Sequence, residues 1–186
     1  GFKVAFRVCE TPLFLTAELM REAERAADAT LREVMAPAYL EQAAQAVPSE
    51  CAVPGGAISP YPHFLCIDFA LAVGEQGEPT LRLIELQGFP SLFGFQWLLG
   101  RMYREAFDLS PELTPYFGGI DEDDYIARLA RQLTGDGDPR ETVLLEIEPE
   151  KQKTRIDFEA THRLTGVEAI GVDQVIVRGD RLFRHD

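Results

Sequence analysis

The chain has 186 residues, of which 46% are hydrophobic and 26% charged, and its formal net charge is −13. This composition is typical of a globular protein with a sizeable core. No cluster of Lys and Arg could line a phosphate backbone, and no apolar run approaches the roughly 20 residues that cross a bilayer, so we expect neither nucleic acid nor a membrane as a partner. The three cysteines have no paired metal spacing, which favours reduced thiols in a cytoplasmic protein.

The first 62 residues predict two helices and a long loop. Residues 13–46 are rich in Ala, Leu, Glu and Arg, with apolar residues at helical spacing that Pro37 interrupts. We therefore expect helices at 13–35 and 37–46. Residues 47–62 contain "VPGG" and "SPYP", which break helices and strands, so this segment is predicted to be a loop.

The next segment predicts a hairpin and two helices. Residues 63–73 and 80–88 are apolar enough for strands, and the short "GEQGEP" between them favours antiparallel pairing. The spacing of "SLFGFQWLLGRMYREAF" predicts a helix with Ser91 as a candidate N-cap. The spacing of "DEDDYIARLARQL" predicts another, whose acids crowd the end that the helix dipole favours.

After the polar "TGDGDPR" the pattern changes to a β-α-β order. Residues 141–149 predict a strand, 154–166 a helix closed by Gly166, and 167–184 a strand followed by a hairpin. This order is typical of the start of a Rossmann-like subdomain. We predict a mixed α/β (α+β) fold with two parts, residues 1–138 and residues 139–186.

Two carboxylates and an amide occupy the predicted hairpin. Asp68 lies inside its first strand, and Glu85 and Gln87 lie two residues apart in its second, so the latter two share a face of the sheet. Antiparallel pairing could bring Asp68 near them, and oxygen donors of this kind suit Mg²⁺. A bound cation would also explain why Glu85 sits among aliphatic residues, where an unpaired carboxylate is costly. Alternatively, Asp68 forms an ion pair with Arg82 and Glu85 points to solvent.

The segment "CIDFALAVGEQGEPTLRLIELQGFPSLFGFQW" resembles part of the circularly permuted ATP-grasp ligases that are similar to glutathionylspermidine synthetase. In that family an Arg-Phe-Asp-Phe strand precedes a Leu-Leu-Glu-x-Asn strand, a Thr-Pro-Thr/Ser turn and a helix that carries Gln and Trp. Residues 141–183 also resemble the family's central β-α-β region, the pre-ATP-grasp subdomain. Together the two matches cover roughly residues 63–184.

The resemblance implies a carboxylate–amine ligase that uses ATP and Mg²⁺. In such enzymes ATP phosphorylates a carboxylate and an amine displaces the phosphate, with no covalent protein nucleophile, so the substrates would be small or peptide-like acids and amines. Carried over by position, Asp68, Glu85 and Gln87 would hold the Mg²⁺ of ATP, and Ser91 would contact substrate. Two positions depart from the family, because Cys66 replaces an arginine and Gln87 replaces an asparagine.

The departures leave a second interpretation open, namely a non-catalytic binding or scaffold module that keeps the ligase fold. Cys66 in place of arginine favours it. The chain also has only three lysines, Lys3, Lys151 and Lys153, whereas a triphosphate needs cationic partners as well as Mg²⁺. From the resemblance and from usual domain sizes we expect the chain to be the N-terminal part of a roughly twofold longer protein and to be inactive as a ligase alone.

Overall fold

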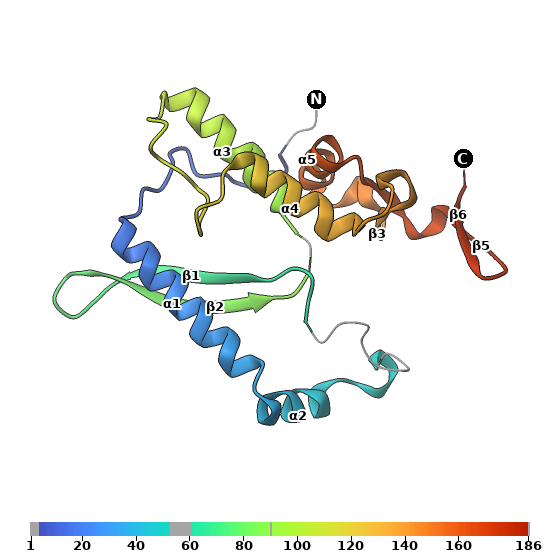
Figure 1. Cartoon of the computed structure of the whole chain (residues 1–186), viewed down its shortest axis with the longest axis horizontal. Coiled ribbons are helices and arrows are strands. Elements are labelled where there is room, and N and C mark those ends of the chain that lie inside the picture. Colours follow the sequence, from blue (N-terminus) through green and yellow to red (C-terminus); the bar gives the residue numbers. More distant parts are fainter. Residues whose placement is uncertain (1–3, 53–60, 90, 186) are drawn as a thin grey trace. The chain divides into compact units, whose positions relative to one another are not determined.

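The computed structural model describes residues 4–52, 61–89 and 91–185, and it confirms the predicted mixed α/β class (Figure 1). The chain forms two compact units. One contains residues 13–90, and the other contains residues 1–12 together with residues 91–186. Among the described helices none is long and apolar enough to cross a membrane.

The unit of residues 13–90 begins with the two predicted helices. Helix α1, Ala17–Val34, starts where the hydroxyl of Thr16 accepts the backbone N–H of Leu19. Helix α2, Pro37–Ala46, has proline in its first turn, where the missing N–H needs no partner within the helix. A short 3₁₀ turn, Ser49–Cys51, follows and is the only described element of the predicted loop.

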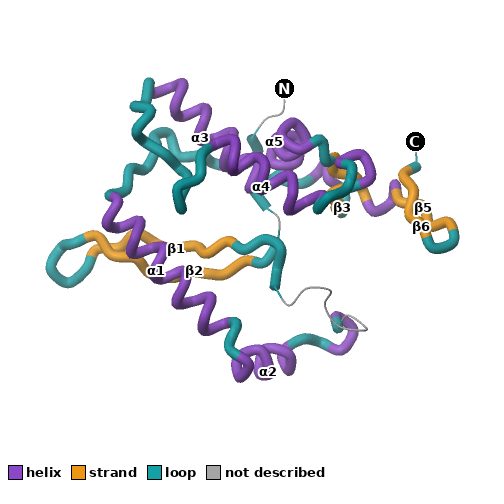
Figure 2. Tube along the Cα trace, viewed as in Figure 1, coloured by secondary structure: helices purple, strands orange, loops and turns teal. Residues whose placement is uncertain are grey.

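The predicted hairpin is confirmed. Strands β1, Cys66–Val73, and β2, Pro79–Gln87, pair antiparallel, and helix α1 crosses them obliquely and contacts β2 (Figures 1 and 2). The turn closes with a hydrogen bond from the Gly74 N–H to the Glu78 carbonyl at 2.7 Å, and Gly77 adopts a left-handed φ of 86° there. The turn chemistry that the sequence shows therefore sets this pairing.

The register gives the hairpin two chemically different faces, because side chains alternate along each strand. The polar face carries small, polar and charged side chains (Cys66, Asp68, Ala70, Ala72, Thr80, Arg82, Glu85, Gln87). The apolar face carries only aliphatic and aromatic ones (Ile67, Phe69, Leu71, Val73, Leu81, Leu83, Leu86). On that face Val73 is 78% exposed and Leu83 53% exposed, whereas Leu19 is the single buried side chain among the described residues of this unit.

The described residues of the second unit form three longer helices and two small sheets. Its helices are α3 (Phe93–Phe107), α4 (Glu122–Thr134) and α5 (Arg155–Thr165). Strands β3 (Val143–Glu146) and β4 (Glu168–Gly171) pair in parallel, and β5 (Val175–Arg178) and β6 (Arg181–Arg184) form a hairpin. The short 3₁₀ turns are Pro139–Glu141, Pro149–Lys151 and Val172–Gln174.

The core of this unit lies around helix α5. Ile156 and Ala160 of the helix, together with Val167 and Ile170 just beyond it, are almost fully buried. The helix ends at Gly166, whose φ of 77° is the left-handed conformation that glycine adopts without strain. Because β3 and β4 are parallel and α5 connects them, the predicted β-α-β order is confirmed.

The division into units falls at a different place from the predicted boundary near residue 138. Helices α3 and α4 belong to the same unit as the β-α-β segment, whereas the predicted boundary placed them in one part with the hairpin. The physical reason is a close junction between α3 and α5: a Cβ added at Gly94 would lie 2.7 Å from the backbone nitrogen of Thr161. Because the two residues are more than sixty positions apart in the sequence, the local composition around either one does not reveal the contact.

Candidate functional site

The polar face of the β1–β2 hairpin brings the predicted ligand residues together. Asp68 pairs directly with Glu85, and Cys66 pairs directly with Gln87. Because residues two apart in a strand share a face, all four side chains lie on the same side of the ribbon. We call Cys66, Asp68, Glu85 and Gln87 the hairpin cluster.

One hydrogen bond links the cluster residues along each strand. The thiol of Cys66 donates to Oδ1 of Asp68 at 3.2 Å. The amide Nε2 of Gln87 donates to Oε1 of Glu85. Each carboxylate is thus held by the neighbouring residue of its own strand, and the two carboxylates face each other across the strand pair.

A β-bulge follows the cluster immediately. The register shifts between Asp68 and Phe69, and Ile84 of β2 is left without a pairing partner. A bulge bends the strand and increases its twist, and bulges are over-represented beside active sites because they re-aim side chains. The Asp68–Glu85 pair is therefore the last regular pair at this end of the ribbon.

The charges in the cluster are hydrated more than the sequence suggested. Glu85 is exposed and Asp68 is half-buried, so solvent lowers the burial penalty that made Glu85 look unusual. Two carboxylates directly opposite each other still repel. Arg82 is the only basic side chain on this face, and it lies opposite Ala70. Within the described residues the alternative ion pair between Asp68 and Arg82 does not form.

The Cys66 thiol is protonated at neutral pH. Its partial burial raises the pKa to about 11, with further contributions from the hydrogen bond to Asp68 and from the negative charges of Asp68 and Glu85. A protonated thiol is a poor nucleophile and a hydrogen-bond donor. The cluster therefore presents two carboxylates, one amide and one neutral thiol.

The donor set fits Mg²⁺ in type, since this ion is usually bound by one or two carboxylates together with water and phosphate oxygens. Among the described residues no group of three or more His, Cys, Asp and Glu side chains is arranged to hold a metal ion. An ion at the hairpin would thus be held by Asp68 and Glu85, with the side-chain oxygen of Gln87 as third ligand. So few protein ligands predict weak binding in the absence of phosphate.

Ser91, the predicted substrate contact, lies at the start of the other unit. Its predicted role as N-cap of α3 is wrong, because the N-cap is Leu92, whose φ of 67° is left-handed and whose side chain makes no capping bond. The first turn of α3 is instead closed by a residue from a different helix.

That residue is Asp157 of α5, which sequence reasoning missed. Its Oδ2 accepts the N–H of Leu92 and its Oδ1 accepts the N–H of Phe95, both at 2.8 Å. The side chain is 3% exposed, and burial raises its pKa although the backbone N–H groups of Phe95, Leu92 and Gly94 oppose the increase. Asp157 thus supplies the negative charge that the positive end of α3 favours.

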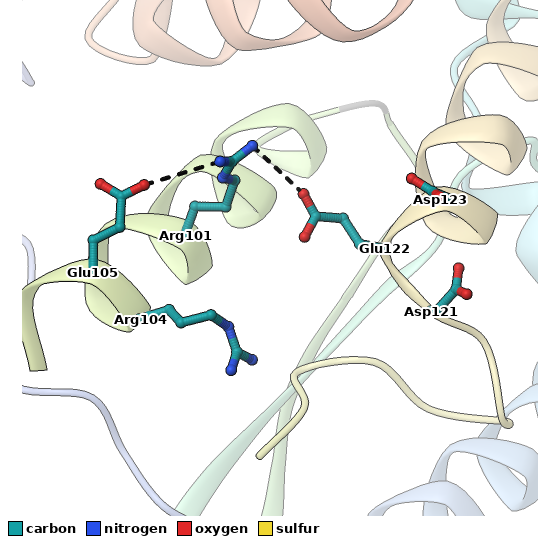
Figure 3. Close-up of a pocket in the computed structure, with 6 residues that line it drawn as sticks. All are labelled: Arg101, Arg104, Glu105, Asp121, Glu122 and Asp123. Atoms are coloured by element: carbon teal, nitrogen blue, oxygen red, sulfur yellow. Dashed lines mark ion pairs between the residues drawn. The ribbon is translucent and has the colours of Figure 1, made fainter. Parts of the chain in front are cut away.

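A charged pocket of about 570 Å³ lies between α3 and α4 in the same unit. Arg101 projects between Glu105 and Glu122, with nitrogen–oxygen distances of 4.0 and 3.8 Å (Figure 3). Its guanidinium also lies 5.3 Å from the ring centre of Trp97. Arg104 donates to the carbonyl oxygens of Ser110 and Leu113. Both arginines therefore have partners within the protein. We interpret the pocket as a structural feature that stabilises this part of the fold, and not as a ligand site.

A smaller pocket of about 310 Å³ lies beside α5. Three glutamates line it, and each has an arginine partner: Glu150 with Arg155, Glu159 with Arg163, and Glu168 with Arg184. Exposed pairs of this kind contribute little to stability. Its charges are balanced, and nothing in its geometry selects a ligand class.

Comparisons with known proteins add no identification: no protein-family model, curated protein or solved structure matches the chain.

Proposed function

We propose that the β1–β2 hairpin is the metal-binding part of an ATP-grasp-like carboxylate–amine ligase, with Asp68, Glu85 and Gln87 as its Mg²⁺ ligands. The observation that carries this proposal is the register, in which Asp68 lies directly opposite Glu85 and next to the pair that contains Gln87. Two acids placed opposite each other without a basic partner are destabilising unless a cation joins them. A cytoplasmic location, where ATP and Mg²⁺ are supplied, is part of the proposal.

In this scheme the protein binds the Mg²⁺ ion and orients the phosphates of ATP. The carboxylates of Asp68 and Glu85 bind the ion, and the Gln87 amide completes the set from the same strand face. Mg²⁺ bound there would neutralise phosphate oxygens of ATP during transfer to a carboxylate substrate. The bulge after Asp68 fixes the direction in which this face points, and Glu85 is open to solvent and so accessible to a phosphate-bearing ligand.

Phosphate binding would need more cations than the described hairpin offers. Arg82 is the single basic residue between Cys66 and Gln87. Lys151 belongs to the other unit and already pairs with Glu148. We therefore expect the 186-residue chain to bind Mg²⁺ and nucleotide weakly and to show no magnesium-dependent ATP hydrolysis.

Isothermal titration of the chain with Mg²⁺, a non-hydrolysable ATP analogue, and both together tests the proposal. Binding of the analogue that requires Mg²⁺ and is lost in Asp68→Asn supports it. Nucleotide binding that is indifferent to Mg²⁺, or no binding of either, rejects it. A Glu75→Ala variant is the matched control, because Glu75 is an exposed acid of the same hairpin and lies in the turn.

A binding or scaffold module without catalysis is the second candidate. The observation that favours it is Cys66, which takes the place of the arginine in the resembled family and is neutral here. Such a module would bind nucleotide or metal without turnover in any context. Mg²⁺-dependent ATP hydrolysis by the isolated chain would exclude a non-catalytic module.

A further inference from the structure

Cys66 lies within the hairpin cluster but supplies none of the proposed ligands. Its Sγ is 3.2 Å from Oδ1 of Asp68, and the register places it opposite Gln87. The side chain is half-buried, unlike Cys9 and Cys51, which are exposed. Its thiol contacts one of the proposed ligand residues without being a ligand itself.

We propose that Cys66 is a positioning residue, whose S–H group donates to Oδ1 of Asp68 and holds that carboxylate in place opposite Glu85. The inference rests on the proposed function, since it assigns a role within the same cation site. It deepens that proposal by naming what keeps one ligand oriented before the ion arrives.

The physical reason is repulsion between the two acids. Without a cation, the charge of Glu85 favours rotation of the Asp68 side chain away from the shared position. A donor two residues along the same strand opposes this rotation, because it stabilises one oxygen of Asp68 on the polar face. The second oxygen, Oδ2, stays available for an ion. A site prepared in this way binds more tightly because less ordering is left to occur on binding.

The test uses Mn²⁺, whose free concentration electron paramagnetic resonance measures directly and which shares oxygen ligands with Mg²⁺. Dissociation constants are measured for the wild-type chain and for Cys66→Ala, Cys66→Val and Cys66→Ser. Alanine and valine remove the donor, valine keeps most of the volume, and serine keeps a donor. Cys51→Ala is the matched control in the same unit. Circular dichroism and a melting curve for each variant separate a loss of fold from a loss of positioning.

We expect Cys66→Ala and Cys66→Val to weaken Mn²⁺ binding about fivefold, the effect of one hydrogen bond. Cys66→Ser should remain within about twofold of the wild type, because the hydroxyl is a competent donor.

The outcomes separate this inference from the proposed function. If the wild type binds Mn²⁺ and both donor-free variants bind equally well, the positioning role is wrong and the metal site stands. If Cys66→Ser weakens Mn²⁺ binding as much as Cys66→Ala does, the positioning role is likewise wrong and the metal site stands. If the wild type binds no Mn²⁺ at millimolar concentration, the proposed function fails and this inference fails with it.

Discussion

Asp157 accepts the backbone N–H of Phe95 at 2.8 Å although the two residues are 62 positions apart in the chain. The same carboxylate accepts the N–H of Leu92, so one buried side chain closes the first turn of α3. A helix start needs such partners because its first N–H groups have none within the helix. The contact therefore joins α3 to the β-α-β segment as well as capping it.

Asp157→Ala should destabilise the chain by about 2–4 kcal/mol, because it leaves one buried and one partly buried N–H group without an acceptor. Asp157→Asn should cost about half as much, since the amide retains one acceptor oxygen. Urea unfolding followed by circular dichroism measures both. Asp136→Ala, at an exposed acid without a described partner, should stay within about 0.5 kcal/mol of the wild type. Equal effects of Asp157→Ala and Asp136→Ala would contradict the capping role.

The pH dependence of this contact has a definite sign. Burial raises the pKa of Asp157 above the ordinary value of 3.8, so the folded chain holds that proton more tightly than the unfolded chain does. The stability linked to this group is therefore present below pH 3.8 and is lost as the pH rises through the folded pKa. The stability difference between the wild type and Asp157→Asn should shrink as the pH rises from about 4 to 7. Unfolding curves measured across that interval decide it, and a difference that grows with pH would be the wrong sign.

Two glycines of α3 should respond oppositely to alanine. At Gly94 an added Cβ would lie 2.6 Å from Oγ1 and 2.7 Å from the backbone nitrogen of Thr161, so α3 and α5 would have to separate. At Gly100 the nearest atom is Pro115 Cγ at 3.8 Å, an ordinary contact. We expect Gly94→Ala to destabilise by about 1–3 kcal/mol, and Gly100→Ala to stabilise by about 0.5–1 kcal/mol. Urea midpoints of the two variants provide the measurement, and a stabilising Gly94→Ala would show that this helix junction is loose.

How much the sequence predicted depends on how local each interaction is. The start of α4 was predictable because Asp121 and Asp124 cap each other three residues apart. The end of α5 was predictable because a glycine directly follows the apolar pattern. The start of α3 was not, since its cap is Asp157, and an aspartate in the first turn of one helix gives no sign that it serves another.

The hairpin cluster shows the same limit. Alternation along the strand predicted that Glu85 and Gln87 would share one face of β2, because the period of two is a local property. The facing position of Asp68 depends on the register, and the bulge at Ile84 changes that register by one residue. The residues next to Ile84 in the sequence do not indicate that a bulge occurs there. A solvent-facing Glu85 was one of the two alternatives that the sequence offered, and the sequence could not decide between them because the exposure of Glu85 depends on whether other segments cover the polar face.

The cysteines should differ in reactivity. Because the pKa of Cys66 is raised to about 11, its thiolate fraction at pH 8 is far below that of an ordinary thiol. We expect iodoacetamide to modify Cys66 about tenfold more slowly than the exposed Cys9 and Cys51. Peptide mass spectrometry measures the rate of modification at each cysteine. Asp68→Asn should speed the reaction at Cys66, since it removes a nearby charge, and should leave the other two unchanged. Equal rates at all three thiols in the native chain would contradict the raised pKa.

Glu85→Ala should separate metal binding from folding. Glu85 is exposed and opposite a like charge, so its removal should change the free energy of unfolding by no more than about 0.5 kcal/mol, in the stabilising direction. It should also weaken Mn²⁺ binding at least tenfold, because only one carboxylate would then remain in the proposed donor set; the tenfold figure corresponds to about 1.4 kcal/mol. Glu75→Ala removes the same charge from the turn of the same hairpin and should leave Mn²⁺ affinity within about twofold, which excludes a general effect of net charge. Paired measurements of unfolding and of free Mn²⁺ on both variants provide the comparison. If the two variants lose affinity equally, the ion is attracted by the acidic surface as a whole, and the pairing of Asp68 with Glu85 has no special part in binding it.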